Sequence, residues 1–523
     1  MKSFTKRLCN FSLQSAKIII LALSLLLFGT AFFTSAYAYM DTQQMIFAWD
    51  NLLLSLISII ASLGLIFLLT NLSYKQKYIK HSLLIFVMIL YALSTLILIV
   101  FNKSVPGADP MTVFRISEQF ATGHMIAIHP TDSYLSYYPH QIGLTAYYEI
   151  LLRIWNLVPG DVIGYHFIKI VNLIWTEILI VCFYKIIEIL FKKNSYQIIY
   201  LFLMMINLPL LMFTTFIYGE VPSIALFSVG LLFLLKLIKK VAATNKSRIA
   251  SIVISTLCFT LSVALRKNML VIMIAVFIAL FFTALLEKRY WLLLLDVAFI
   301  GTCLFITPGI QILYELRAGN YLNDGVPALT YFAMGMQYAD RGNGWYNGYN
   351  FTTYENSGLD AALASKTAAE YISSRLDYFS QNLGECFKFY FDKFQVQWCD
   401  GTYASLQATL ATFGGRRPFF ENLYSYNGFG HVIFIFICNV FQNLLYLGNC
   451  IFCLVTFKQK DKKYSFPHYL CLIGVLGIFL FHTIWEANSR YIFHSSILLL
   501  PTAAYGLGFL LSAIQNIKKV KRK

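Results

Sequence analysis

Apolar stretches of about 20 residues recur along most of this chain, and they restrict its fold more than any other feature. A helix of that length crosses a hydrocarbon layer of about 30 Å. Lipid cannot hydrogen-bond to exposed backbone groups, so each crossing segment has to be helical. Because 58% of the 523 residues are hydrophobic and only 13% are charged, the composition also excludes an ordinary soluble globular protein. The sequence therefore predicts an all-α polytopic membrane protein.

Twelve of the apolar stretches are suited to crossing a membrane. We expect them at residues 16–37, 51–70, 82–101, 164–191, 197–217, 223–238, 249–265, 268–286, 291–312, 432–456, 468–483 and 495–517. Three lie in residues 1–101, six form a membrane core in residues 164–312, and three lie in residues 431–523 with a basic tail. The first stretch follows a basic start and ends in Ala36-Tyr37-Ala38, as a cleavable signal peptide would. It is long for a signal peptide, so we favour an uncleaved first span.

Lysine and arginine residues fall mainly in short clusters between the apolar stretches. The clusters lie at residues 2–17, 75–80, 192–193, 236–248, 288–289, 458–463 and 518–523. With the N-terminus inside, alternation of the spans puts all of them in the cytoplasm, as the positive-inside rule requires. The formal charge of +16 therefore indicates a multi-pass protein of the cell membrane, with the lipid bilayer as its partner and both termini cytoplasmic. It does not indicate a nucleic-acid surface.

The same alternation places two large regions outside the cytoplasm. The first is a loop at residues 102–163, in which an amphipathic stretch at residues 138–155 is too short to cross and is expected to be an interfacial or re-entrant helix. The second is a polar segment at residues 313–430, in which we expect a helix at residues 361–378 and an amphipathic helix beside the membrane at residues 382–398. Cys386 and Cys399 lie in this segment, where an outer location would permit a disulfide.

Two acids stand at the outer ends of predicted helices. Asp109 precedes Pro110 and a helix-like stretch closed by Gly123, which is the pattern of an N-cap. Asp109 is then either a cap alone or a general base for an acceptor hydroxyl. Glu220 follows an apolar stretch on the same side. It is either an ordinary interfacial acid or the second acid of a pair that orients an acceptor and, if one is used, a divalent cation.

Two basic positions near the outer surface indicate an anionic ligand. Arg266 and Lys267 occupy a short turn that the alternation leaves outside, against the positive-inside pattern. Either they bind a lipid phosphate by charge-assisted hydrogen bonds, or this turn is cytoplasmic and the alternation fails locally. Between the last two spans, Glu486 and Arg490 form either an ion pair that holds two helices or a phosphate site at Arg490.

Other chemistries find little support in the sequence. His124, His129 and His140 with Asp132 do not have the spacing of an established metal site. We find no Walker loop, dinucleotide-binding glycine motif or serine nucleophile elbow, which argues against soluble nucleotide chemistry. No cofactor is predicted beyond the divalent cation named above.

Several short motifs can be followed along the chain. They are Asp109 with Glu118 and Gly123, Tyr137-Tyr138-Pro139-His140-Gln141, Tyr218-Gly219-Glu220-Val221-Pro222, Leu265-Arg266-Lys267-Asn268, Gly344-Trp345-Tyr346-Asn347, and Trp485-Glu486 with Ser489-Arg490-Tyr491. Together they resemble the C-type polytopic glycosyltransferases, the superfamily of protein O-mannosyltransferases and bacterial aminoarabinose transferases. The chain departs from that pattern by two extra spans before the first outer loop, by glutamate in place of aspartate at position 220, and by His140 where lysine is common.

The resemblance implies that a sugar moves from a polyprenyl-phosphate donor to an extracytoplasmic hydroxyl, with inversion at the sugar carbon. The acceptor would be a cell-envelope glycan, a lipid or a protein. Asp109, as general base, and Glu220 are implied as catalytic residues. The residues implied to bind the donor phosphate are Arg266, Lys267, Arg490 and His140, and those implied to bind acceptor or sugar are Glu118, Tyr138, Gln141, Trp345 and Glu486.

Two other functions stay open. A transporter or flippase for a lipid-linked sugar would need similar phosphate-binding cations, but transporters usually keep polar groups at the bilayer midplane and often show inverted repeats. This sequence gathers acids and aromatics at one predicted surface and shows no such repeat. A non-catalytic scaffold for cell-envelope assembly is the third hypothesis.

Overall fold

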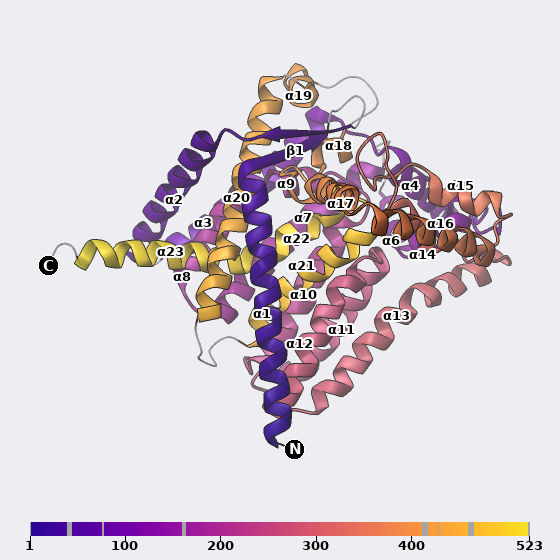
Figure 1. Cartoon of the computed structure of the whole chain (residues 1–523). Helices are drawn as coiled ribbons and strands as arrows, with labels where there is room; N and C mark the ends of the chain where they lie inside the picture. Colours follow the sequence, from indigo (N-terminus) through magenta and orange to yellow (C-terminus); the bar gives the residue numbers. More distant parts are fainter. Residues whose placement is uncertain are drawn as a thin grey trace.

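The structure is a computed structural model that describes residues 2–38, 44–75, 78–158, 164–410, 417–426, 428–458 and 465–520. Helices make up most of these residues, and Figure 1 follows them from the N-terminal α1 to the C-terminal α23. The basic clusters predicted at residues 75–80, 458–463 and 518–523 lie partly outside the described residues.

Ten of the described helices are long and apolar enough to cross a membrane. They are α1 (Lys2–Phe33), α2 (Leu52–Lys75), α3 (Ile79–Ile97), α7 (Gly164–Phe191), α10 (Glu220–Ile238), α11 (Asn245–Leu265), α12 (Met269–Glu287), α13 (Trp291–Ala318), α20 (Phe429–Lys458) and α21 (Phe466–Ile484). Two bent pairs qualify as well, α8 (Asn194–Met205) with α9 (Leu208–Thr214), and η3 (Ser489–Ile492) and α22 (Phe493–Leu498) with α23 (Leu500–Val520). Counted as single spans, the pairs raise the number to twelve. The predicted fold class is confirmed.

Both bent spans change direction at a proline. Pro209 stands at the start of α9 and Pro501 near the start of α23. Proline lacks a backbone N–H and its ring clashes with the preceding turn, so a helix does not continue straight through it. The bends measure 63° and 54°. Asn207 stabilises the first one, because its side chain accepts a hydrogen bond from the Leu210 backbone N–H at 3.1 Å.

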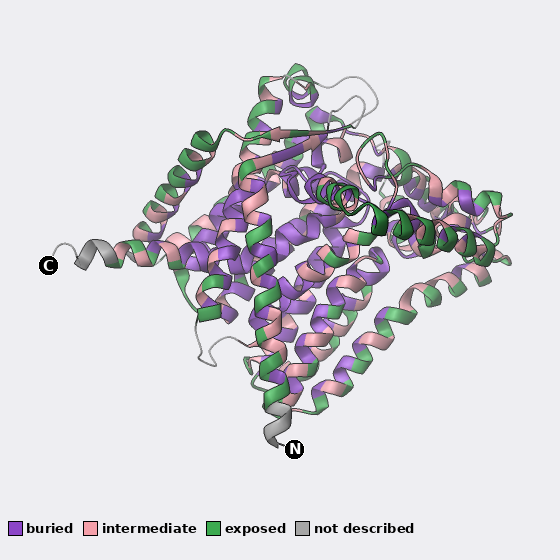
Figure 2. Ribbon diagram, in the orientation of Figure 1, coloured by how far each residue is buried: buried purple, intermediate pink, exposed green. Residues whose placement is uncertain are grey.

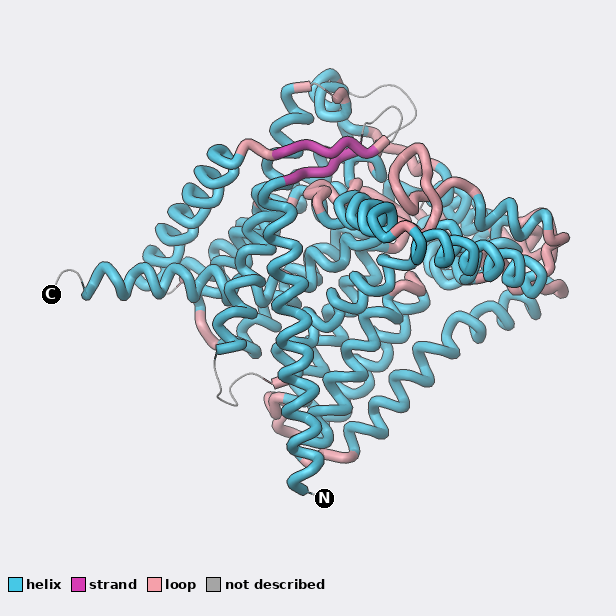
Figure 3. Tube along the Cα trace, viewed as in Figure 1, coloured by secondary structure: helices cyan, strands magenta, loops and turns pink. Residues whose placement is uncertain are grey.

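A short pair of antiparallel strands joins α1 to α2. The strands are β1 (Thr34–Ala38) and β2 (Met45–Trp49), with Thr34 opposite Trp49. The sequence predicted that the first span continues to residue 37, but α1 ends at Phe33. The backbone N–H of Ala36 donates a hydrogen bond to the carbonyl oxygen of Cys399 at 2.9 Å, a tertiary contact that no local pattern reveals. Figure 3 shows the strands at the opposite end of α1 from the N-terminus.

Both regions predicted to lie outside the membrane contain the expected helices. The first holds α4 (Ala108–Ala121), α5 (Tyr134–Tyr137), η2 (Pro139–Gln141) and α6 (Ile142–Trp155). The second holds α14 (Ala328–Met334), α15 (Tyr349–Asn356), α16 (Ala361–Gln381), α17 (Leu383–Trp398), α18 (Ser405–Ala408) and α19 (Pro418–Tyr424). These helices gather at one end of the bundle, in the upper part of Figure 1. The helices predicted at residues 361–378 and 382–398 are confirmed as α16 and α17.

The second half of α17 is buried in the bundle, which the amphipathic pattern did not predict, and the position of this helix beside the membrane stays a prediction. Leu383 and Phe387 at its start are exposed, whereas residues 393–398 are all buried. The buried Lys393 donates a hydrogen bond to the carbonyl oxygen of Gly335 at 2.6 Å. α17 therefore runs from an exposed start into the bundle, where it contacts β1, η3 and α21.

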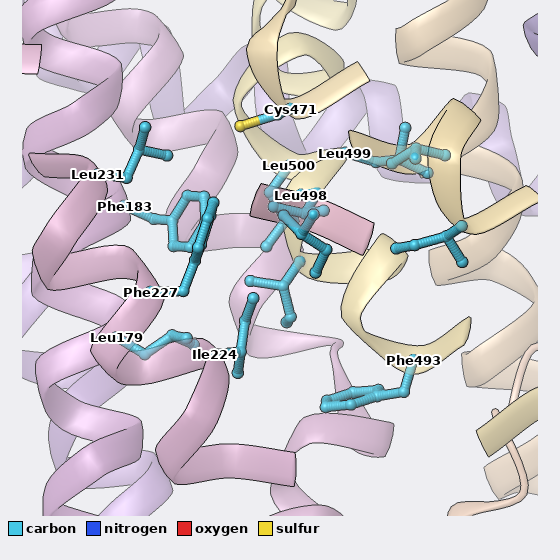
Figure 4. Packing of buried hydrophobic residues seen from close by; sticks show 14 of the residues in the cluster. Leu179, Phe183, Ile224, Phe227, Leu231, Cys471, Phe493, Leu498, Leu499 and Leu500 are labelled. Atoms are coloured by element: carbon cyan, nitrogen blue, oxygen red, sulfur yellow. The ribbon is translucent and has the colours of Figure 1, made fainter. Parts of the chain in front are cut away.

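The helix α10 forms the centre of the bundle and is buried along almost its whole length. It packs against α7 and α11, and Figure 4 shows Ile224, Phe227 and Leu231 of α10 facing Leu179 and Phe183 of α7. In Figure 2 the outer helices α2 and α13 are largely exposed. Exposed apolar side chains on outer helices suit contact with lipid, so the burial pattern is that of a membrane bundle with a packed centre.

The helices α20 and α23 touch each other through a pair of glycines. A β-carbon on Gly506 would overlap the carbonyl oxygen of Gly448, and one on Gly448 would lie 2.6 Å from the carbonyl oxygen of Ala503. Helices in lipid associate through close backbone packing, because lipid tails are as apolar as the side chains. This contact therefore depends on the missing side chains.

The Gly506→Ala variant is expected to lower the stability of the detergent-purified protein by about 1–3 kcal/mol, because an added methyl group overpacks the contact. Gly301→Ala in α13 is the matched control, since no atom lies within 4 Å of its added β-carbon. Its stability should stay the same or rise, because alanine favours a helix over glycine. Thermal unfolding of both variants tests this, and equal melting temperatures would contradict the close contact.

The disulfide that the sequence permits between Cys386 and Cys399 is excluded by the structure. Cys386 lies in the first turn of α17, and Cys399 follows the end of this helix. At ~1.5 Å per residue, the helix separates them by about 20 Å, and a disulfide needs Cα atoms within about 7 Å. Both cysteines are free.

Candidate functional site

Asp109 lies in the first turn of α4, and its carboxylate does not cap the helix. The N-cap residue is Gly107, which has an extended backbone. The prediction of Asp109 as the N-cap is wrong, because the helix already begins at Ala108, whose φ is 46°. Gly123 follows the end of α4 as predicted, with a φ of 89°. The Asp109 carboxylate is therefore available for other interactions.

Tyr218 holds the Asp109 carboxylate and joins it to two other parts of the chain. Its hydroxyl donates a hydrogen bond to Asp109 Oδ2 at 3.3 Å and accepts one from Gln141 Nε2 at 2.9 Å. The hydroxyl oxygen of Tyr134 lies 3.2 Å from the hydroxyl oxygen of Tyr218. Tyr218 and Gln141 are both buried. The structure thus places Gln141, which was predicted to bind acceptor or sugar, where it positions Tyr218.

Two arginines lie against the Tyr218 ring. The guanidinium carbon of Arg266 is 4.9 Å from the ring centroid, and that of Arg490 is 5.5 Å away. Arg266 follows the end of α11, and Arg490 belongs to η3. Cation–π contacts of this kind hold the guanidinium groups in place. Two of the predicted phosphate-binding residues therefore meet beside Asp109.

Glu220 is fully buried and paired with Arg266. Arg266 Nη2 lies 3.0 Å from Glu220 Oε1. The contact is an ion pair without the alignment of a hydrogen bond, since neither carboxylate oxygen of Glu220 has a hydrogen-bond partner among the described residues. Because Glu220 is 0% exposed, a substrate does not reach it in this structure. Its placement is that of a residue that positions Arg266.

The position of Glu220 also shows which end of the bundle holds the site. Glu220 begins α10, and Lys236 and Lys239 lie at the other end of this helix. A helix of this length spans about 28 Å, close to the thickness of the hydrocarbon layer. Arg266 therefore lies at the opposite membrane face from the basic cluster at residues 236–248. The alternative in which this turn shares a membrane face with the basic cluster at residues 236–248 is therefore not supported, and which face is cytoplasmic stays a prediction.

Asp109 is an exposed residue although protein atoms surround its carboxylate on several sides. Asp109 is exposed, yet burial by neighbouring atoms raises its pKa above the usual value, while Arg490, the Tyr218 hydrogen bond and Arg266 act in the opposite direction. Both facts fit a carboxylate enclosed on several sides and open on one. In the described part of the chain it has no ion-pair partner within 4 Å. A carboxylate with a raised pKa is a better proton acceptor once it is ionised.

Glu486 and Arg490 do not form an ion pair with each other. Glu486 Oε1 accepts a hydrogen bond from the Tyr491 hydroxyl at 2.9 Å, and the guanidinium of Arg490 lies 5.2 Å from the Tyr491 ring centroid. The Arg490 Nε is buried and has no hydrogen-bond partner among the described residues. The sequence left open an ion pair between Glu486 and Arg490 or a phosphate site at Arg490, and the ion pair is absent. Arg490 as a whole is only partly buried, so its guanidinium group is a candidate for binding an anionic ligand.

The Glu486 carboxyl is expected to make stability depend on pH. Burial raises its pKa to about 7, against the Tyr491 hydrogen bond and Arg490. Between the ordinary pKa of 4.5 and about 7, the folded protein retains a proton that the unfolded chain has released, so stability falls as pH rises through this window. Glu486→Gln removes this titration. Its melting temperature should therefore vary less than that of wild type between pH 5 and 8.

Melting curves of detergent-purified protein across this pH range provide the measurement. Glu370→Gln removes an exposed carboxylate from α16 and serves as the control, which should keep the wild-type pH dependence. A Glu486→Gln protein whose melting temperature falls as steeply as that of wild type would contradict the expectation.

Tyr138 lies near Asp109, and His140 lies near Arg266 and Lys267. Burial, helped by Lys267 and Arg266, lowers the pKa of His140 to about 3. The ring is therefore neutral near pH 7 and adds no positive charge, although it still donates one N–H. The Tyr138 ring lies 6.2 Å from the His140 ring. Burial, then the charges of Tyr346 and Asp109, raise the pKa of the Tyr138 hydroxyl. Lys267 is exposed.

Two predicted site residues lie apart from this cluster. Glu118 is exposed near the end of α4, about 13 Å further along the helix than Asp109 and on its opposite side. Trp345 is 3% exposed and packs in the hydrophobic core. Its neighbour Tyr346 is 42% exposed, and burial, then Asp109 and Glu486, raise the pKa of its hydroxyl. Tyr346 is therefore the residue of this motif that lies near Asp109.

Three residues at the site were not predicted from the sequence. Tyr218 belongs to a motif that drew attention for Glu220, and its aromatic position at the end of an apolar stretch was the available signal. Tyr134 and Lys393 carry no such signal. Burial lowers the pKa of Lys393 to about 7, while the charge of Glu486 acts to raise it. The buried Lys393 therefore interacts electrostatically with Glu486.

The residues offer little to a metal ion. Within the described ranges, no group of three His, Cys, Asp or Glu side chains is arranged to hold one. The acids considered for a divalent cation are Asp109 and Glu220, and Glu220 has Arg266 as its counter-ion.

Comparison of the chain with known protein families, curated proteins and solved structures found no match.

Proposed function

We propose that this protein is a glycosyltransferase that moves a sugar from a polyprenyl-phosphate donor to an acceptor hydroxyl. The observation that carries the proposal is that Asp109, an exposed residue, is hydrogen-bonded to Tyr218, against whose ring two arginines lie. A general base and a cationic site for a leaving anion are the two groups that a single displacement at a sugar carbon needs. In this proposal Asp109 supplies the first group, and Arg266 and Arg490 supply the second.

The bond changes follow from these roles. The acceptor hydroxyl loses its proton to Asp109 as its oxygen forms a bond to the anomeric carbon. The bond between that carbon and the phosphate oxygen breaks, and the electron pair stays on the phosphate. The products are an inverted glycoside and the polyprenyl phosphate. Because a phosphate leaves as a stable anion, no acid is needed opposite Asp109.

Arg490 and Arg266 would stabilise the departing phosphate. Arg490 is only partly buried and has no ion-pair partner among the described residues, and guanidinium groups often bind phosphate oxygens in a bidentate manner. Glu220 would keep Arg266 oriented, and the exposed Lys267 would add a further charge. His140 would contribute an N–H and no charge. In this proposal Tyr138, Tyr346 and Glu486 surround the sugar and the acceptor.

The location of the site favours a transferase over a transporter. The polar cluster lies at the end of α10 where Glu220 begins the helix. A transporter would place its site near the bilayer midplane. The basic clusters at residues 192–193 and 236–248 lie at the other end of this helix, so the positive-inside rule puts Asp109 on the extracytoplasmic side. Both termini are then cytoplasmic.

A deletion strain tests the proposal. Mass spectrometry of its cell-envelope glycans should show the loss of one sugar substituent, and its lipids should show the matching polyprenyl-phosphate sugar on the outer leaflet. Accumulation of that lipid on the cytoplasmic leaflet would instead establish a flippase. An unchanged set of envelope sugars would overturn both.

A further inference from the structure

A cavity of about 1030 Å³ lies at the end of α10 far from Glu220. It is formed where α7, α8, α10, α21 and α23 come together. Its charged lining residues are Lys185, Glu188, Lys192, Lys193, Lys236 and Lys239. Five lysines thus face one acid. The cavity is separate from the Asp109 site, because the length of α10, about 28 Å, lies between them.

The positive charge of the cavity is not balanced within the described chain. Lys185 pairs with Glu188 at 3.0 Å. The other four lysines have no ion-pair partner among the described residues. Burial lowers the pKa of Lys239, with Glu287 opposing and Lys192 reinforcing the shift. Like charges around a partly dehydrated cavity repel one another strongly, so an anion in the cavity would lower the free energy of this end of the bundle.

The remaining walls of the cavity are apolar and aromatic. The Tyr505 ring lies 5.0 Å from the Phe191 ring and 5.0 Å from the Tyr196 ring, and all three residues line the cavity. Phe509 lines it too and is 38% exposed. A soluble anion would gain nothing from contact with these apolar side chains. An amphiphile would bind better, because its head group would contact the lysines while its chains contact the aromatic rings.

We propose that this cavity binds a membrane lipid through a phosphate group in its head group, at the membrane face opposite Asp109. Basic pockets between membrane helices are suited to anionic lipid head groups. The volume, about 1030 Å³, is at the upper end of the range of small-molecule sites, about 300–1,000 Å³, and offers room for a head group with part of its chains. The proposal does not rest on the transferase function, since lipid binding is measured without turnover.

Binding is tested with the full-length protein in phosphatidylcholine nanodiscs, with spin-labelled phosphatidylglycerol as the probe. The immobilised fraction of the probe reports the occupied site. The variant Lys236→Gln/Lys239→Gln should weaken binding about thirtyfold, as expected for the loss of roughly 1 kcal/mol for each of two lysines near an anionic lipid. The control Lys246→Gln/Lys288→Gln removes the same charge from exposed positions outside the cavity and should bind as wild type does. A melting curve of each variant shows that it is folded.

Further arms separate the sources of the phosphate. Spin-labelled phosphatidylcholine should not be retained, and inorganic phosphate at 10 mM should not displace phosphatidylglycerol. Equal binding by the two lysine double variants, or retention of phosphatidylcholine to the same extent, would overturn the proposal. Full displacement by inorganic phosphate would show a site for a soluble anion and would equally overturn it.

Discussion

The Asp109→Asn variant is expected to lower the rate of sugar transfer by a factor of about 10² to 10⁴, the range that general base catalysis supplies. Asparagine keeps the shape of the side chain, and its oxygen still accepts the hydrogen bond that Tyr218 donates. It cannot take the proton of the acceptor hydroxyl. The variant should therefore fold and bind the donor while transfer nearly stops.

The measurement is the rate at which a labelled sugar enters the envelope glycans of the deletion strain that carries each variant at equal protein level. Glu118→Gln is the matched control, because Glu118 is exposed on the opposite side of α4. Its rate should stay within a few-fold of wild type. If Asp109→Asn transferred sugar as fast as wild type, the general base would have to be another residue. If Glu118→Gln failed equally, the effect would belong to the helix and not to the carboxylate.

The Glu220→Gln variant is expected to destabilise the protein by about 3–5 kcal/mol, the cost of leaving a buried charge without its partner. The side chains of Arg266 and Glu220 are 9% and 0% exposed, and their charged atoms lie 3.0 Å apart. Glutamine fits the space but leaves Arg266 uncompensated in a poorly hydrated region. The thermal unfolding of the detergent-purified variant should therefore shift to clearly lower temperature.

The exposed Glu370 of α16 provides the control. It has no ion-pair partner among the described residues, and substitutions at such surface positions usually change stability by about 0.5 kcal/mol or less. Glu370→Gln should therefore melt close to wild type. Adding Arg266→Leu to Glu220→Gln should restore part of the lost stability, since the orphaned charge is removed. A Glu220→Gln protein as stable as wild type would show that the ion pair contributes nothing to the stability of the fold.

The sequence by itself determined the membrane fold. Stretches of about 20 apolar residues leave the chain no stable alternative to membrane-spanning helices, and all twelve predicted stretches match a span or a bent pair. The helices α4, α6, α16 and α17 were predictable as well, because capping residues and amphipathic spacing are local signals. Asp109, Arg266 and Arg490 could be selected as candidates, because charges beside apolar stretches need a reason to be there.

Only the tertiary structure decided how these residues are used. The pairing of Glu220 with Arg266, the place of Tyr218 between Asp109 and two arginines, and the insertion of α17 into the bundle all join segments far apart in the chain. The choice of Tyr346 over Trp345 depends on which side of a loop packs inward. Local sequence patterns indicate whether a single segment is more stable in lipid or in water. Which side chains meet depends on long-range packing, and no single segment contains that information.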